Sequence, residues 1–151
     1  MIIKTIRSGG QSGVDRAALE VAKESGIPIE GWCPKDGWAE DMQTPPGIRA
    51  LYPELKETPL KNVAQRTVWN VRDSDATLVI KTKISPGTDL TERAARIFHK
   101  PYLVTNMTDI EEVKEWLSKC DGDIRLNIGG PRESEDPGIK ERAKTFLRKL
   151  F

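Results

Sequence analysis

A glycine-rich segment near the amino terminus carries the strongest pattern for binding chemistry. It reads Ser8-Gly9-Gly10-Gln11-Ser12-Gly13 and is followed by Asp15 and Arg16. Glycines let a ligand approach the backbone closely, and successive N–H groups before a helix form a concave site for an anion. The spacing matches neither G-x-G-x-x-G nor a P-loop. We expect this loop to bind a phosphate-bearing small molecule, with the phosphate near Gly9-Gly10 and a polar ring or sugar group at Asp15.

The same residues also allow a structural interpretation. Ser12-Gly13-Val14-Asp15 matches a capping box, in which Ser12 caps the following helix and Asp15 returns the hydrogen bond. This role is compatible with ligand binding. However, a carboxylate in the first helical turn repels a phosphate placed there, and Arg16 is the residue that can offset it.

The next candidates are Trp32 and Lys35, which follow a predicted strand. Trp32 can stack on a ring and Lys35 can pair with an anion. The structural alternative is a core tryptophan beside a solvated lysine.

Arg66 and Asn70 lie about one helical turn apart and therefore point from one helix face. Arginine suits planar phosphate recognition. The structural alternative is an ion pair between Arg66 and Asp73 or Asp75.

Two later loops complete the set of candidate binding groups, and both follow predicted strands. The first loop could bind an anion through hydroxyls and backbone groups near a helix start, and its structural alternative is an ordinary turn with an N-cap. Its residues are Ser85, Gly87, Thr88 and Thr91. In the second loop, Gly129 and Gly130 allow close approach of a ligand to the backbone, and Arg132 could contact an anion or a neighbouring subunit. The structural alternative is a surface loop. We expect all five loops to meet at one edge of a sheet.

Composition excludes several other classes of site. The 151 residues carry a net charge of +1, so no general attraction draws the chain to nucleic acid or an anionic membrane. Apolar runs stay well short of the ~20 residues that span a bilayer, and we expect a cytoplasmic protein. Two cysteines, Cys33 and Cys120, form no disulfide framework, and a single histidine, His99, argues against a protein-ligated metal. His99 ends a predicted helix, where a surface or capping role is expected.

Strands and helices must alternate to position these loops. Apolar, β-branched runs predict strands at 2–6, 27–32, 76–80, 102–104 and 124–128. Helical spacing predicts helices over 14–22, 60–71, 90–98 and 110–117, and a last helix with Asp136 as N-cap and Pro137 at its first position. Segment 33–59 is rich in proline and glycine, and we expect an irregular wall or lid with at most a short helix near 48–51.

This alternation is typical of an α/β fold. We expect residues 1–151 to form a single three-layer Rossmann-like domain, with a mainly parallel sheet of about five strands and helices on both faces. Ligands of such sheets bind beyond the carboxyl ends of the strands.

Several segments together resemble the molybdenum carrier family, whose members are similar to molybdenum cofactor carrier proteins. They are SGGQSGVDRAAL (8–19), GWCPK (31–35), RTVWNV (66–71), DSDATL (73–78), GTDLT (87–91) and LNIGGPRES (126–134). The family resembles part of the SLOG branch of Rossmann-like folds, which includes lonely-guy phosphoribohydrolases. The resemblance implies a ligand such as molybdenum cofactor (molybdopterin) or a nucleotide, and a homo-oligomer, dimer or tetramer.

Two positions depart from the relatives' pattern. Pro86-Gly87-Thr88 stands where relatives show Gly-Gly-Thr, and proline deletes one N–H donor. Glu92 follows at a different spacing from the glutamate of the lonely-guy pattern P-G-G-x-G-T-x-x-E, which weakens the case for glycosidic cleavage.

Three functions stay open at this point. The first is a binding or carrier protein. The second is a nucleotide hydrolase of the lonely-guy type, with general acid–base work by Asp15, Glu40, Asp41 or Glu92. The third is a nucleotide sensor that acts through a partner. For a homo-oligomer, Trp69 and Trp116 are candidate contact residues, with burial in the core as the alternative.

Overall fold

Five parallel strands form the central sheet of the computed structural model, which describes residues 2–82 and 86–151. Their order is β2-β1-β7-β5-β6, and every neighbouring pair is parallel. The strands are β1 (Ile2–Arg7), β2 (Ile29–Glu30), β5 (Ala76–Ile80), β6 (Tyr102–Thr105) and β7 (Asp123–Gly129). Because β7 inserts between β1 and β5, the loops that follow these three strands lie side by side at one edge.

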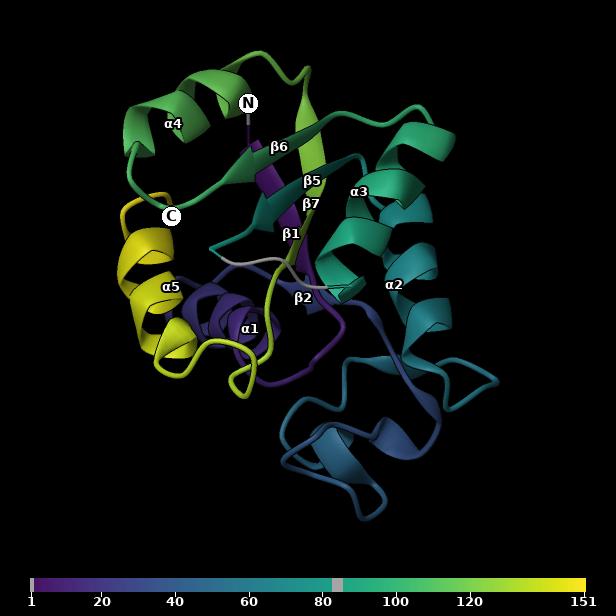
Figure 1. The fold of residues 1–151 in the computed structure, drawn as a ribbon. Helices are drawn as coiled ribbons and strands as arrows, with labels where there is room; N and C mark the ends of the chain where they lie inside the picture. The colour runs from purple at the N-terminus through teal and green to yellow at the C-terminus, as the bar shows by residue number, and fades with distance from the viewer. Residues whose placement is uncertain (1, 83–85) are drawn as a thin grey trace.

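Helices cover both faces of the sheet (Figure 1). One face carries α1 (Val14–Glu24), α4 (Ile110–Ser118) and α5 (Ile139–Arg148). The other carries α2 (Val63–Arg72) and α3 (Pro86–Ile97), which pack on each other. The three-layer α/β fold with a parallel sheet is therefore confirmed. No helix in the described part of the chain has the length and apolar character needed to cross a membrane.

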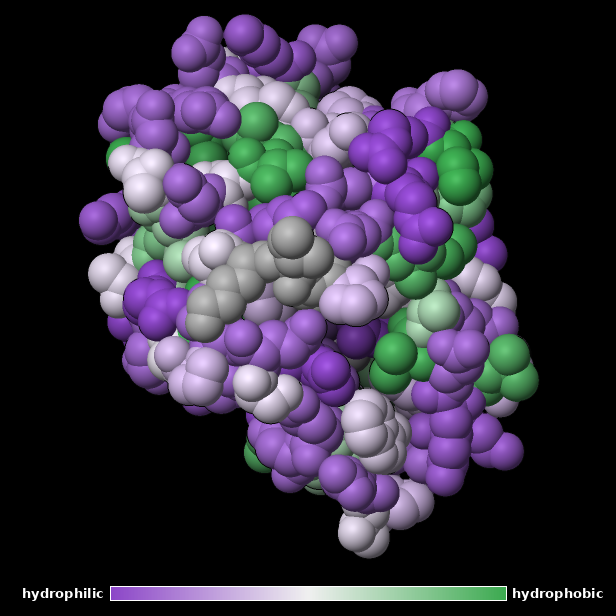
Figure 2. All heavy atoms as spheres, viewed as in Figure 1, coloured by the Kyte–Doolittle hydropathy of each residue, from purple (hydrophilic) through white to green (hydrophobic). Residues whose placement is uncertain are grey.

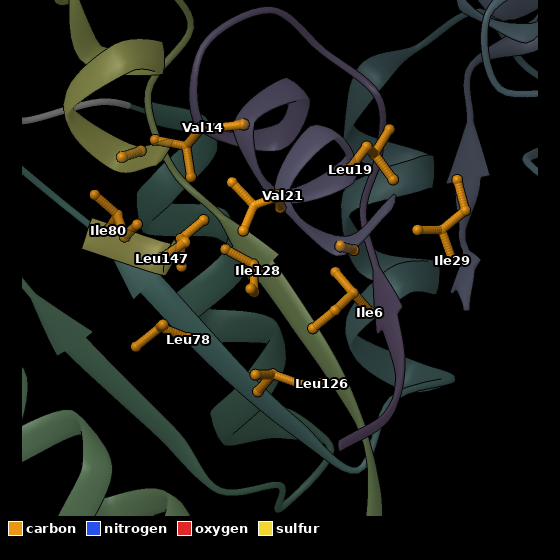
Figure 3. Packing of buried hydrophobic residues seen from close by; sticks show 14 of the residues in the cluster. Ile6, Val14, Leu19, Val21, Ile29, Leu78, Ile80, Leu126, Ile128 and Leu147 are labelled. Atoms are coloured by element: carbon orange, nitrogen blue, oxygen red, sulfur yellow. The ribbon is translucent and has the colours of Figure 1, made fainter. Parts of the chain in front are cut away.

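The main core lies between the sheet and the α1–α5 face. Figure 3 shows Ile6 and Ile128 of the sheet near Val21 of α1, and Leu126 and Val14 belong to the same hydrophobic cluster. All five residues of β5 are buried, as expected for a strand covered on both faces. A smaller cluster beneath α2 and α3 holds Val71, Ala94 and Ala95.

The strand predicted at 27–32 is divided in two at Gly31. This glycine has φ 146°, and a Cβ there would lie 2.0 Å from the carbonyl oxygen of Ser8. After the division, β3 (Trp32–Cys33) pairs with β4 (Lys56–Glu57) in a separate two-stranded sheet.

Segment 33–59 contains more regular structure than the single short helix expected there. Besides β4 it has the 3-10 turns η1 (Lys35–Gly37) and η2 (Gly47–Ala50), the second of which matches the predicted short helix. In Figure 1 this segment forms a lobe below the sheet.

The N-caps that the sequence suggests for α1 and α5 are not formed, and Pro137 is not the first residue of α5. Asp136 does not cap α5, because Gly138 adopts a left-handed conformation (φ 88°) and delays the helix to Ile139. The carboxylate of Glu133 accepts hydrogen bonds from the amides of Gly138 (2.7 Å) and Lys140 (3.0 Å) instead. Asp136 pairs with Arg142 at 2.7 Å.

At α1 the N-cap is Gly13, without a side-chain hydrogen bond, so Ser12 and Asp15 form no capping box. The Ser12 hydroxyl donates to Glu40 and accepts from the amide of Glu133. Long-range partners thus outcompete the local cap.

Candidate functional site

A cavity of about 360 Å³ opens at the carboxyl edge of β1 and β7. The loop after β1, the end of β7, one side of α2 and the first turns of α3 form its wall. Predicted site residues from four of the five loops line it: Gly9, Gln11, Asp15, Arg66, Asn70, Gly87, Thr91, Gly129, Gly130 and Arg132. The sheet edge therefore brings these loops together as the topology requires.

An ion pair between α2 and α1 dominates the polar side of the cavity. The Nη1 atom of Arg66 donates to Oδ2 of Asp15 at 2.9 Å, and the two side chains are 13% and 6% exposed. The alternative pairing of Arg66 with Asp73 or Asp75 is wrong, because these aspartates pair with Arg72 and Arg125.

Burial of Asp15 has an electrostatic consequence. Desolvation raises the pKa of this carboxyl above its ordinary value, although Arg66, the amide of Gln11 and Arg16 act in the opposite direction. A buried carboxyl of raised pKa inside a cavity is a common feature of functional sites.

The guanidinium of Arg66 lies across Gly9. A Cβ at Gly9 would lie 2.3 Å from Nη1 and 2.8 Å from Cδ of Arg66. Within residues 2–82 and 86–151, Nη1 is the only nitrogen of this guanidinium with a hydrogen-bond partner, and Nε is buried without one. Arginine carries five N–H donors, so most of its capacity is unused.

The amides of the first glycine loop are largely occupied by the chain itself. Those of Gly10, Gln11, Ser12 and Val14 donate to Ser8 Oγ (3.3 Å), Asp15 Oδ2 (3.4 Å), Gln11 Oε1 (3.0 Å) and Pro131 O (3.2 Å). Ser8 also donates to the carbonyl of Asp15 at 2.9 Å. The loop is therefore stabilised by its own hydrogen bonds, and most of its amides are not free to bind an anion.

The start of α3 faces the cavity through Pro86, Gly87, Leu90 and Thr91. Its first-turn amides have no helical partners, which makes this end favourable for an anion. The Thr91 hydroxyl donates to the carbonyl of Gly87 (3.0 Å). Thr88 is buried and does not line the cavity, whereas Ser85 lies outside the described residues.

The aromatic residue in the wall is Trp38 rather than Trp32. The indole of Trp32 donates to Asp73 (2.7 Å) and lies edge-on to Trp69, with ring centroids 4.9 Å apart. Asn70 exchanges two hydrogen bonds with the backbone of Trp32, so it holds this strand as well as lining the cavity. Lys35 is exposed and does not line the cavity. Trp38 was not predicted as a site residue, although it lies in the segment expected to form a wall.

Three predicted residues face a second hollow behind the glycine loop: Ser12, Gly13 and Arg16. Arg16 forms two hydrogen bonds with Asp41, at 2.9 and 3.0 Å, and one with the carbonyl of Gly10. It therefore binds the 33–59 segment and does not offset a phosphate in the cavity.

The other carboxylates proposed for catalysis lie outside the cavity. Glu92 forms an ion pair with Lys81 at 2.9 Å, and Glu40 and Asp41 face the second hollow. Missed lining residues include Asn127 and Glu135; the latter pairs with Arg132 at 3.2 Å. Across the described parts of the chain, no group of three or more histidine, cysteine or acidic side chains could hold a metal ion.

Comparisons with known proteins agree with the fold and the motifs. A crystal structure described as "Putative molybdenum carrier protein" from Syntrophus aciditrophicus SB is 37% identical in sequence, with a TM-score of 0.84. The similarity covers 96% of this chain and 92% of that one. No curated protein matches. Residues 6–151 match the circularly permutated YpsA SLOG family, which confirms the resemblance drawn from the sequence. This chain belongs to the circularly permutated YpsA SLOG family.

Proposed function

We propose that this protein binds and carries a phosphorylated small molecule in the cavity at the carboxyl edge of β1 and β7. The observation that carries the proposal is Arg66, a largely buried cation that lines the cavity: its Nη1 pairs with Asp15, its Nε is buried without a partner, and its Nη2 has no hydrogen bond within the described chain. Buried polar groups are almost always hydrogen-bonded, and a phosphate oxygen supplies the missing acceptors.

The remaining wall suits a ligand that joins an anion to a ring. The start of α3 adds positive potential beside Arg66. Trp38 and the apolar residues Val63, Leu90 and Ile128 offer a surface for a flat ring. The volume falls at the lower end of the range of roughly 300–1,000 Å³ typical of small-molecule sites.

Two ligand classes fit this description, a nucleotide and molybdenum cofactor (molybdopterin). The second is suggested by the name of the structural neighbour. Both carry a phosphate and a heterocycle, so they share the recognition chemistry of Arg66 and Trp38.

Mass spectrometry and metal analysis of the material that co-purifies with the protein identify the ligand directly. Calorimetry with adenosine monophosphate and with pterin phosphates then compares wild type with Arg66→Ala. Loss of hydrogen bonds to a charged group costs about 1.5–3 kcal/mol, so affinity should fall by roughly 10- to 150-fold. Arg148→Ala, which removes an exposed arginine paired with Glu24, should bind as wild type does. Equal affinity of wild type and Arg66→Ala contradicts the proposal.

A hydrolase acting on a nucleotide N-glycosidic or phosphate bond is the second candidate. It is favoured by Asp15, because burial raises the pKa of this carboxyl inside the cavity, which suits a general acid. Incubation of nucleoside monophosphates with concentrated enzyme, followed by chromatography, tests it. Product that disappears in Asp15→Asn supports hydrolysis, and absence of product from wild type eliminates it.

A homo-oligomer in the cytoplasm completes the proposal. Large apolar side chains are exposed at Leu60, Val63 and Ile97, and Figure 2 shows apolar residues along the side formed by α2 and α3. Light scattering that detects monomer alone would remove the oligomer from the proposal.

A further inference from the structure

A tight turn in the 33–59 segment sits beside the cavity wall. Ala39 and Met42 exchange two backbone hydrogen bonds, at 3.2 and 3.0 Å, so Glu40 and Asp41 occupy the tip of the turn. Trp38, which lines the cavity, immediately precedes it. The position of the indole therefore depends on what holds the turn.

Glu40 holds the turn to two separate loops. Its Oε1 accepts hydrogen bonds from the Ser12 hydroxyl and from the amide of Ser134 (3.1 Å), and its Oε2 accepts from the Ser134 hydroxyl (2.6 Å). The amide of Glu40 donates to Oε1 of Gln11 at 2.9 Å. Arg132 adds an ion pair at 3.6 Å. One carboxylate thus joins the turn to the glycine loop and to the loop between β7 and α5.

Asp41 and Glu54 of the same segment each contact one element, α1, whereas Glu40 joins two loops. The Glu40 side chain is 19% exposed, whereas that of Asp41 is 46% exposed and contacts α1 through Arg16. Glu54 is 38% exposed and pairs with Lys23 at 2.8 Å, and neither residue lines the cavity. The Lys23–Glu54 pair is exposed on both sides and contributes little to the position of a backbone segment, whereas Arg16 is buried and gives the turn a second contact, with α1.

Two cavity-lining residues share these contacts. Gln11 accepts from Glu40 through the same side-chain oxygen that accepts the amide of Ser12. Arg132 divides its guanidinium between Glu40 and Glu135. The turn is therefore connected to residues that line the cavity as well as to the loops around it.

We propose that Glu40 is a positioning residue: its carboxylate fastens the turn to the two loops and so keeps the Trp38 indole in the wall of the cavity. The inference about the placement of Trp38 is drawn from these contacts and is independent of the proposed function. The consequence for ligand affinity rests on the proposed function.

The placement is tested in the free protein labelled with fluorotryptophan. Fluorine NMR gives a signal for each of the four tryptophans, and Trp38→Phe identifies the one from Trp38. In Glu40→Ala, this signal should shift, and its exposure to a soluble paramagnetic probe should rise severalfold. In Glu54→Ala it should stay as in wild type. A Trp38 signal that is unchanged in Glu40→Ala overturns the proposal.

Conservative replacement separates positioning from general stability. Glu40→Gln keeps an oxygen for Ser12 and the Ser134 amide and can donate to the Ser134 hydroxyl, so it should restore the wild-type Trp38 signal. If Glu40→Ala does not fold, Ser134→Ala removes one of the contacts and should move the same signal in the same direction. Failure of both variants to move it contradicts the positioning role.

Adenosine monophosphate serves as the ligand probe in the second arm. Loss of the aromatic wall should weaken its binding about tenfold in Glu40→Ala, with recovery in Glu40→Gln. If wild type does not bind this nucleotide, the proposed function fails for nucleotides of this class, while the Trp38 signal still decides the role of Glu40. If wild type binds and Glu40→Ala binds equally well, the link between Glu40 and affinity is wrong.

Discussion

Replacement of Gly9 by alanine gives a direct test of how the polar side of the cavity is built. Gly9 does not have a positive φ, so alanine fits its backbone. The new methyl would lie 2.3 Å from Nη1 and 3.0 Å from Cζ of Arg66. Since the arginine side chain is flexible and the loop is braced by its own hydrogen bonds, the guanidinium is the part that must move. Gly9→Ala therefore removes Arg66 from Asp15 without deleting either residue.

The magnitude follows from the burial of the pair. Removing one partner of a buried ion pair costs about 3–5 kcal/mol. Arg66 is displaced toward solvent rather than lost, and Asp15 can take up a proton, so we expect about 2–4 kcal/mol less stability at neutral pH. Without Arg66, the pKa of Asp15 rises further above its unfolded value of 3.8. The folded variant then binds a proton more tightly than its unfolded chain, so the deficit shrinks as the pH falls.

Urea denaturation at two pH values measures this effect. The control is Gly87→Ala, because a Cβ there meets nothing within 4 Å and alanine is favoured in a helix by about 0.5–1 kcal/mol. The control should be neutral or stabilising. In an Arg66→Ala background, Gly9→Ala should cost less than about 0.5 kcal/mol, because its target is gone. Equal costs of Gly9→Ala with and without Arg66, or a deficit independent of pH, would refute the reasoning.

Two further substitutions test the framework around the site. The Arg72 guanidinium, together with the Trp32 indole, lowers the pKa of Asp73 to about 2 against the opposing effect of burial. This stabilisation is complete above the unfolded pKa of 3.8 and is lost as the pH falls through about 2. The difference in stability between wild type and Asp73→Asn should therefore be constant near neutrality and shrink below about pH 4. Urea titrations at several pH values measure this difference. Gly31→Ala should prevent folding or lower the melting temperature sharply, because its Cβ would meet the Ser8 carbonyl at 2.0 Å; circular dichroism that shows a wild-type melt would contradict the close approach.

Most of the fold could be predicted from local sequence. The buried strand at 76–80 and the amphipathic helices have periodicities that depend on burial alone, and their alternation limits the topology to a layered parallel sheet. The division at Gly31 could not be predicted, because its cause is a contact with Ser8, which is distant in sequence. The caps failed for the same reason: Ser12 bonds to Glu40 and Glu133 rather than to its own helix.

The candidate site was predicted in outline but not in detail. The rule that loops after parallel strands meet at one edge brought Gly9, Arg66 and Gly129 into one list, and all three line the cavity. The ion-pair partners of these residues could not be predicted in this way, because the partner of Arg66 is Asp15, 51 positions away. Local patterns offered nearer aspartates as partners. Likewise, no spacing rule distinguishes Trp38 from Trp32, since both lie near the same strand end.

The close approaches at Gly13 and Gly130 bear on how fast a ligand enters and leaves. A Cβ at Gly13 would lie 2.3 Å from the carbonyl of Pro131, and one at Gly130 would lie 2.6 Å from that of Ile80. Backbone therefore packs on backbone at the start of α1 and at the ends of β5 and β7, while the turn next to Trp38 is held mainly by side chains. We therefore expect a ligand to enter and leave past Trp38, in which case the opening rate of this wall sets an upper limit on association at high ligand concentration. We expect differences in affinity among related ligands to appear in residence time.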